Sequence, residues 1–135
     1  MSDARTHPVT DIVGIDPRQA AKLRMGGVET VADMWAHAGD RAGRSELAGT
    51  TGISVERLAE WAKRADLMRV EAIGPRSAAL LEAAGVTSLR QLRHRSAEAL
   101  HEALIQVNRK AKVVESPPSL EEVVGWIEQA DAIAR

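Results

Sequence analysis

The sequence predicts an all-α fold built from two copies of one helical unit. Aromatic residues make up only 2% of the 135 residues, and no segment alternates between apolar and polar residues with a period of two. Apolar residues instead recur at intervals of three and four, which is the spacing of one helix face. One such series is Val55, Leu58, Trp61, Ala62 and Ala65. Two stretches of the chain also repeat each other, which indicates an internal duplication.

The repeat appears when residues 9–35 are aligned with residues 67–93, an offset of 58 residues. Eight positions then carry the same residue in both segments. The identical pairs are Ile15 and Ile73, Pro17 and Pro75, Arg18 and Arg76, Ala20 and Ala78, Ala21 and Ala79, Leu23 and Leu81, Gly27 and Gly85, and Val28 and Val86.

The match resumes where residues 54–66 are aligned with residues 119–131, at an offset of 65. Because the two matching segments follow in the same order with only a change of length between them, they indicate a duplicated unit. We predict a first unit at residues 9–66 and a second at residues 67–131. The two units are expected to share one core within one compact domain and to be related by a pseudo-two-fold axis.

The ends of the predicted helices are marked by the same residue types in both units. Pro17 and Pro75 suit the first position of a helix, because a backbone N–H at that position has no acceptor within the helix and proline lacks this N–H. Gly27 and Gly85 suit the left-handed residue that ends a helix. Hydroxyl side chains that can cap helix N-termini precede the other apolar segments. They are Thr30, Ser54, Ser88, Ser96 and Ser119. Together these signals predict at least seven helices.

Apolar residues that recur in both units are expected to be buried in the core. They are Ile15, Leu23, Val28, Ile73, Leu81 and Val86. Trp61 and Trp126 also recur and lie on apolar helix faces, so we interpret them as core residues. Trp35 has no aromatic counterpart, because Arg93 occupies its place in the second unit. It is therefore the tryptophan expected to be most exposed or to contact a partner.

The net charge of −1 hides an uneven distribution. Residues 1–68 carry 9 basic and 10 acidic side chains, and residues 69–113 carry 8 basic and 4 acidic ones. Residues 114–135 carry 1 basic and 5 acidic side chains. The middle of the chain is thus basic, although the total charge is not that of an obvious nucleic-acid-binding protein.

The composition excludes disulfides, zinc sites built on thiolates and cysteine nucleophiles, because the chain has no cysteine. No apolar stretch approaches the ~20 residues that a membrane helix needs. The polar N-terminal segment has no apolar signal region, so we expect a cytoplasmic protein without a membrane partner. The histidines His7, His37, His94 and His101 lack metal-ligand spacing. Because no catalytic motif is present, we expect no enzymatic activity, cofactor or metal.

Residues 70–81, V-E-A-I-G-P-R-S-A-A-L-L, resemble a helix-hairpin-helix motif. The pattern of that motif is an apolar residue, a tight Gly-apolar-Gly hairpin, and a helix that begins with proline and a basic residue. Residues 13–21 carry the same motif in the first unit. Over residues 9–131 the chain resembles a bacterial family of small proteins of unassigned function that carry such motifs in pairs.

This resemblance implies binding to the DNA backbone. In the family, glycines let the hairpin approach a phosphate closely, and the N-terminus of the following helix attracts the anion. We call residues 12–16 hairpin one and residues 70–74 hairpin two. The implied phosphate-binding positions are Gly14, Asp16 and Arg18 in the first unit and Ala72, Gly74 and Arg76 in the second.

Both hairpins depart from the motif. Asp16 stands where the second glycine belongs, so that its carboxylate could cap the helix and would repel phosphate. Ala72 replaces the first glycine of hairpin two. Hairpin two is therefore the better candidate for DNA binding, and hairpin one is expected to be structural.

Two basic runs leave the function open between two classes. One comprises Arg90, Arg93, His94 and Arg95, and the other Arg109, Lys110 and Lys112. They are either solvated helix surface or part of a phosphate-binding face. We therefore expect a module that binds DNA without sequence specificity through hairpin two, Arg90, Arg93 and Arg95. The alternative is a module that has kept the fold, has lost DNA binding and serves an unidentified protein partner.

Overall fold

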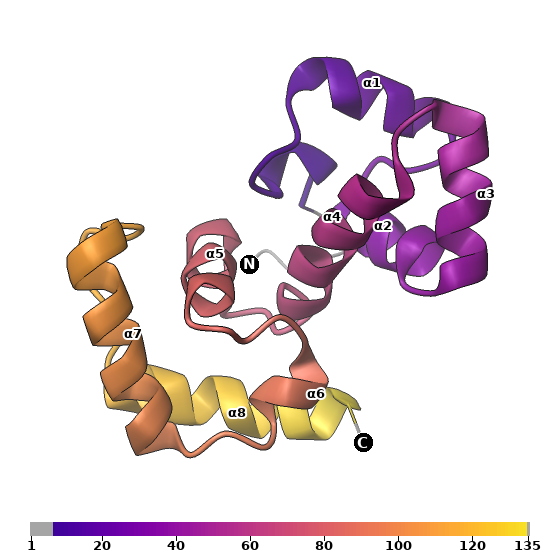
Figure 1. Ribbon diagram of the computed structural model, residues 1–135. Coiled ribbons are helices and arrows are strands. Elements are labelled where there is room, and N and C mark those ends of the chain that lie inside the picture. The colour runs from indigo at the N-terminus through magenta and orange to yellow at the C-terminus, as the bar shows by residue number, and fades with distance from the viewer. Residues whose placement is uncertain (1–6, 135) are drawn as a thin grey trace.

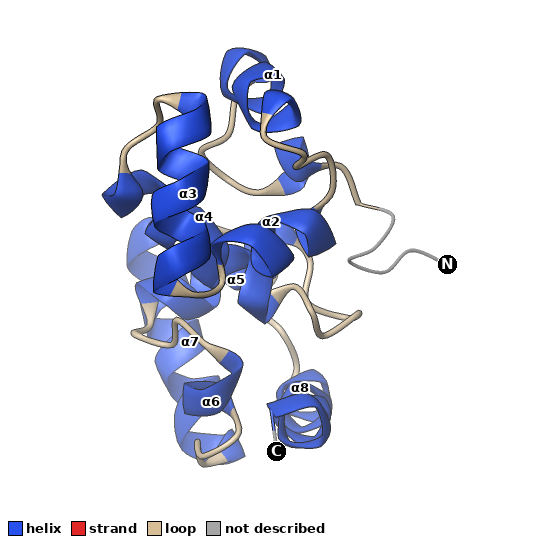
Figure 2. Cartoon of the chain, turned by 90° about the vertical axis from the view of Figure 1, so that its right-hand side faces the viewer, coloured by secondary structure: helices blue, strands red, loops and turns tan. Residues whose placement is uncertain are grey.

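The computed structural model describes residues 7–134, and in this range it contains eight α-helices and no strand (Figures 1 and 2). The helices are α1 (Pro17–Met25), α2 (Val31–Ala38), α3 (Arg41–Thr51), α4 (Val55–Leu67), α5 (Pro75–Ala83), α6 (Leu89–Leu92), α7 (Ala97–Ala111) and α8 (Leu120–Ala134). A 3-10 turn at Val9–Asp11 precedes them. The all-α prediction and the expected minimum of seven helices are confirmed. Part of the N-terminal segment discussed above lies outside the described residues.

Seven of the helices begin where the sequence predicted, whereas α3, which is capped by Asp40, was not among the predicted elements. Pro17 and Pro75 are the first residues of α1 and α5, and Gly27 and Gly85 both have φ +89°. The side chains that accept a hydrogen bond from the backbone N–H three residues ahead include all five predicted caps, Thr30, Ser54, Ser88, Ser96 and Ser119. Local residue chemistry therefore sets the bounds of most helices.

The carboxyl group of Asp33 completes the cap of α2. Burial raises the pKa of this group, but hydrogen bonds donated by the backbone N–H groups of Glu29 and Thr30 and by the Thr30 hydroxyl outweigh it. The pKa of Asp33 consequently lies below its usual value. The carboxylate stays ionised at neutral pH, where a negative charge at a helix N-terminus is favourable.

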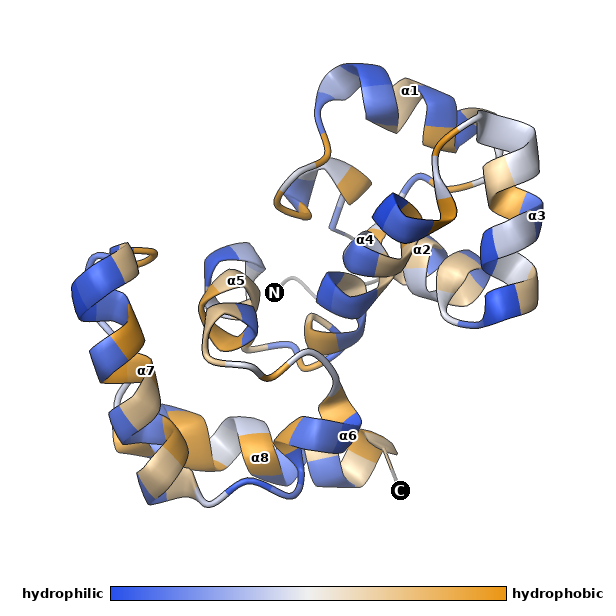
Figure 3. Cartoon of the chain, viewed as in Figure 1, coloured by the Kyte–Doolittle hydropathy of each residue, from blue (hydrophilic) through white to orange (hydrophobic). Residues whose placement is uncertain are grey.

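The helices form two lobes, α1–α4 and α5–α8 (Figure 1). In the first lobe α2 packs on α4 and α3 packs on both, whereas in the second α6 and α7 pack on α8. Helix α5 lies between α4 and α7 and contacts both, which links the lobes. Figure 3 shows α8 as mainly apolar and α7 as mixed, and some of the apolar side chains of α8, Leu120, Val124 and Ile133, are exposed.

The buried apolar side chains of both lobes belong to one hydrophobic cluster. All six predicted core residues, Ile15, Leu23, Val28, Ile73, Leu81 and Val86, are buried in it. Trp61 and Trp126 are each 2% exposed, which confirms that they pack in the core. Trp35 is only half-buried, so it is the most exposed of the three tryptophans.

Truncating either buried tryptophan should destabilise the whole chain. Loss of so large a buried side chain costs about 3–5 kcal/mol, a large part of a total stability on the order of 5–15 kcal/mol. Trp61→Ala and Trp126→Ala should therefore each lower the melting temperature sharply in a thermal scan followed by circular dichroism. Met25→Ala, at a side chain that is 77% exposed, is the control and should melt like the parent. Unchanged melting of both tryptophan variants would contradict the packing described here.

Candidate functional site

Hairpin one packs against α4. The Ile15 N–H donates to the Ile12 carbonyl at 3.2 Å, which closes the turn. Gly14 has φ +101°, a conformation that favours glycine. A Cβ on Gly14 would lie 3.0 Å from Nη1 of Arg64 and 3.3 Å from Nε1 of Trp61. The glycine is thus required by its contact with α4, on a side where no ligand has room.

The start of α1 is occupied by its own carboxylate. The Gln19 N–H donates to Oδ1 of Asp16 at 2.8 Å, and the Asp16 N–H donates to Oε1 of Gln19 at 3.2 Å. Asp16 is therefore the helix cap, as one interpretation of the sequence held. Because this negative charge lies where a phosphate would have to bind, the geometry supports a structural role for hairpin one. Arg18 is exposed on the first turn of α1.

Arg64 connects hairpin one with the second lobe. Its guanidinium donates to the Val13 carbonyl and forms a bidentate ion pair with Glu82 of α5, with Nε–Oε2 at 2.7 Å and Nη2–Oε1 at 3.1 Å. The hydrogen bonds to Glu82 raise the pKa of Arg64, although partial burial opposes this. The sequence analysis did not identify Arg64 or Glu82, because nothing in their local pattern shows that two side chains 18 residues apart on different helices meet.

Hairpin two has the same closing hydrogen bond but a different surface. The Ile73 N–H donates to the Val70 carbonyl at 2.9 Å. Ala72 is exposed and does not adopt the positive φ of Gly14, since Lys112 is the only non-glycine residue with positive φ in the described range. The alanine is accommodated by this change of backbone conformation.

Gly74 begins α5 without a side-chain cap. Each of the other seven helices in residues 7–134 has a capping side chain. Gly74 has φ −86°, and no side chain or backbone atom from beyond its own turn of chain lies within 4 Å of the position its Cβ would take. Arg76, in the first turn, is exposed. The N-terminus of α5 is thus open, uncapped and flanked by an accessible cation.

The three predicted arginines of the first basic run have different roles. Arg90 on α6 and Arg95 in the α6–α7 connection are exposed. Arg93 instead pairs with Asp131, with Nη2–Oδ1 at 2.7 Å and Nε–Oδ1 at 3.0 Å, and its Nη1 donates to the Ala134 carbonyl at 3.3 Å. Arg93 therefore holds α6 against α8 and is not available to a ligand in this geometry.

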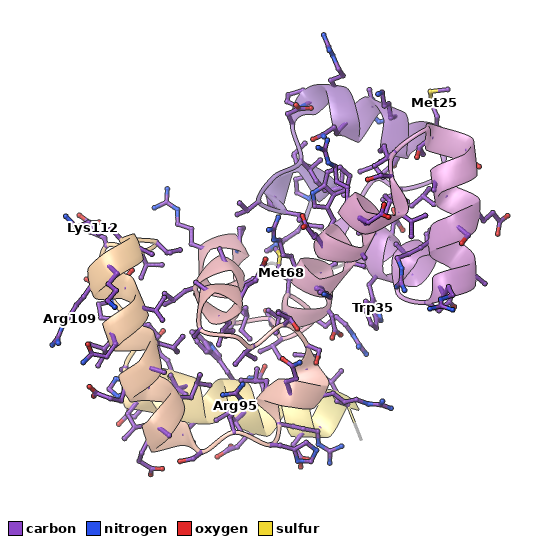
Figure 4. The ribbon with its side chains drawn as sticks, in the orientation of Figure 1. Met25, Trp35, Met68, Arg95, Arg109 and Lys112 are labelled. Carbon is purple, nitrogen blue, oxygen red and sulfur yellow. The ribbon has the colours of Figure 1, made fainter. Side chains whose placement is uncertain are left out.

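The second basic run lies far from the first. Arg109 and Lys112 are at the opposite end of α7 from Arg95 (Figure 4). The 15 residues of α7 separate the two runs by about 22 Å at 1.5 Å per residue. The structure does not combine these cations into a single patch.

Asp66 joins the two lobes from a buried position. The Leu89 N–H at the start of α6 donates to Oδ2 of Asp66 at 3.0 Å, and Nη1 of Arg69 donates to Oδ1 at 2.8 Å. The Arg69 guanidinium lies over the Trp35 ring, 5.0 Å from its centroid. The sequence did not reveal this carboxylate, because its partner in α6 is 23 residues away.

Within residues 7–134, no group of three or more histidine, aspartate or glutamate side chains could hold a metal ion. In the same range, no helix has the length and apolar character needed to cross a membrane. A family profile described as "Domain of unknown function (DUF4332)" matches residues 13–133. Comparison with curated proteins and with solved structures gives no significant match.

The two hairpin glycines should respond differently to alanine. Gly14→Ala should lower the free energy of unfolding by about 2 kcal/mol, because its φ is positive and Arg64 lies in the way. Gly74→Ala should cost clearly less, at most about 1 kcal/mol, because its φ suits alanine and its Cβ position is open, so that only the preference of an N-cap for glycine over alanine is lost. Urea denaturation measures both values. Equal destabilisation by the two variants would contradict the distinction between the hairpins.

Removing the Asp66 carboxylate should weaken the junction between the lobes. Asp66→Ala leaves the Leu89 N–H and Arg69 without their acceptor, and an unsatisfied buried donor costs about 1–3 kcal/mol. Asp66→Asn keeps one acceptor oxygen and should lose less. Denaturant unfolding of both variants tests this ordering, and a fully stable alanine variant would show that the junction does not need the carboxylate.

Proposed function

The chain belongs to the DUF4332 domain family, and from this premise we propose that it is a non-catalytic module that binds the phosphate backbone of nucleic acid without sequence specificity. The observation that carries the proposal is the start of α5, where Gly74 leaves the helix uncapped and Arg76 is exposed. A helix N-terminus carries partial positive charge on its free N–H groups and attracts phosphate oxygens.

The surroundings of Gly74 fit a close approach of the nucleic-acid backbone. Since no atom occupies the Cβ position of Gly74, a phosphate oxygen can approach the backbone there. Arg76 can add a charge-assisted hydrogen bond from the same turn. Contacts of this kind position a protein on nucleic acid without reading its sequence, because every nucleotide carries the same phosphate.

We also infer that the chain consists of two helix-hairpin-helix units, residues 9–66 and 67–131, related by a pseudo-two-fold axis. Matching backbone conformations support the duplication. Asp16 and Gly74 have φ/ψ of −89°/172° and −86°/−175° at the starts of α1 and α5. Gly26 and Ala84 have φ/ψ of −92°/7° and −90°/5° at the ends of these helices.

The alternative is a protein-interaction module, and the surface of the first lobe favours it. Met25 at the end of α1 is 77% exposed, and Val13 at the tip of hairpin one is 46% exposed. Figure 4 shows Met25 projecting from the outer side of this lobe. Val13 is exposed on the hairpin that repels phosphate and Met25 at the opposite end of α1, and exposed apolar side chains suit a protein partner better than a nucleic acid.

Binding of duplex DNA should depend on salt and on hairpin two. If about four phosphates are neutralised, the logarithm of the binding constant should fall with the logarithm of salt at a slope of about −3.6. Arg76→Ala should weaken binding and make the slope shallower by about one. Gly74→Ala should weaken binding while the protein stays folded, because its new methyl group blocks the approach of a phosphate. Fluorescence anisotropy of labelled duplexes of two unrelated sequences measures these effects.

The matched control is Arg18→Ala, at the equivalent position of the first unit. It should change DNA affinity much less than Arg76→Ala, because Asp16 already occupies the start of α1. If neither duplex nor single-stranded DNA binds at low salt, the proposal is wrong and the protein-interaction module takes its place.

A further inference from the structure

The exposed side of α1 is basic and ends in an apolar side chain. Arg18, Lys22 and Met25 recur at intervals of four and three residues, so they lie in one stripe along the helix, and all three are exposed. The helix contains no acidic residue, and the neighbouring carboxylate of Asp16 accepts the Gln19 N–H as the helix cap. No ion pair within residues 7–134 engages Arg18 or Lys22. We call the stripe of Arg18, Lys22 and Met25 the α1 face.

Helix α8 carries an apolar stripe of the same length, flanked by carboxylates. Leu120, Val124 and Ile127 repeat the spacing of four and three residues. Leu120 and Val124 are exposed, and Ile127 is half-buried. Glu121 and Glu128 lie seven residues apart beside this stripe and are both exposed. No ion pair in the described part of the chain engages either carboxylate. We call these five residues the α8 face.

The two faces lie at opposite ends of the molecule. Figures 1 and 2 both show α1 at the top, in the first lobe, and α8 at the bottom, in the second. The cations of the α1 face therefore cannot pair with the carboxylates of the α8 face within one chain. Among residues 7–134, every exposed large apolar side chain except Val55 lies on α1, in hairpin one or on α8. The exposed apolar surface is thus concentrated beside these unpaired charges, as at a contact with another protein.

We propose that the α1 face of one copy of this chain binds the α8 face of a second copy. The cations of the α1 face then meet the carboxylates of the α8 face, and Met25 packs on its apolar side chains. Both stripes extend over seven residue steps, about 10 Å at 1.5 Å per residue, so the charged and apolar contacts can form together. Opposite charges across a contact select the partner and its orientation. The net charge of −1 leaves no general repulsion between copies.

Because the two faces differ, the contact is head-to-tail. A copy bound through one face still presents the other, so association continues beyond a dimer unless a ring closes. The contact is small, since α1 has 9 residues and is about 14 Å long, whereas stable interfaces bury roughly 800 Å² on each partner. We therefore expect weak, reversible association that salt weakens further, because salt screens exposed charges. The contact does not include hairpin two and does not depend on DNA binding.

Analytical ultracentrifugation of the 135-residue chain, freed of nucleic acid so that no strand links the copies, tests the proposal. The weight-average mass should rise as the protein concentration is raised from about 10 μM to about 1 mM. It should fall when salt is raised from about 0.05 M to about 0.5 M. Lys22→Glu and Glu128→Lys should each weaken self-association by about tenfold or more, because each places like charges across the contact. Both side chains are exposed, so both variants should fold like the parent.

A mixture of the two variants tests whether the two faces bind each other. An equimolar mixture should associate again, because the Glu128→Lys chain supplies an intact α1 face and the Lys22→Glu chain an intact α8 face. The matched control is Lys63→Glu, which makes the same change of charge at an exposed position of α4, outside both faces. This control should associate like the parent.

Two results would overturn the proposal. A mass that stays that of a monomer up to about 1 mM would show that the two faces do not bind each other, and would leave a different protein as their partner. Association that persists in either single variant, or that the mixture does not restore, would place the contact between copies elsewhere on the surface.

Discussion

The arrangement of the two lobes depends on the buried carboxylate of Asp66. An ion removed from water is tolerated only when it is paired and hydrogen-bonded. Asp66 meets this requirement by accepting the Leu89 N–H of the second lobe with one oxygen and Arg69 with the other. Because Arg69 in turn lies over Trp35, the same carboxylate fixes the approach of α6 to α4 and, through Arg69, the position of the Trp35 ring of α2.

Internal ion pairs also determine which cations can bind a ligand. Arg64 is engaged by Glu82 and the Val13 carbonyl, Arg69 by Asp66, and Arg93 by Asp131. These arginines hold helices together, so they contribute charge to the surface but few free donors. Within residues 69–113, Arg69 and Arg93 are therefore structural and do not add to a phosphate-binding face. Arg76 lies outside such pairs and is exposed beside hairpin two, where phosphate binding is proposed.

The sequence predicted what depends on local chemistry. Prolines, glycines and capping hydroxyls act within one turn, so the helix ends and the buried apolar faces followed from the pattern of residues. The missed features are tertiary: Asp66 reaches an N–H 23 residues ahead, and Arg64 reaches a carbonyl 51 residues away. Arg93 was expected at a phosphate-binding face because its sequence neighbours are basic, whereas its actual partner lies 38 residues further along. No single-residue signal encodes such distances.

The contrast between the two hairpins has an energetic meaning. A helix that lacks its N-terminal cap is less stable by about 1 kcal/mol, and α5 lacks the cap that Asp16 gives to α1. The deep burial of Ala78, Leu80 and Leu81 offsets this loss, since each apolar side chain removed from water contributes on the order of 1–3 kcal/mol. The fold thus tolerates unsatisfied N–H groups at one helix start, where a phosphate would satisfy them. In the first lobe the same position is closed by a carboxylate, so a ligand has nothing to add there.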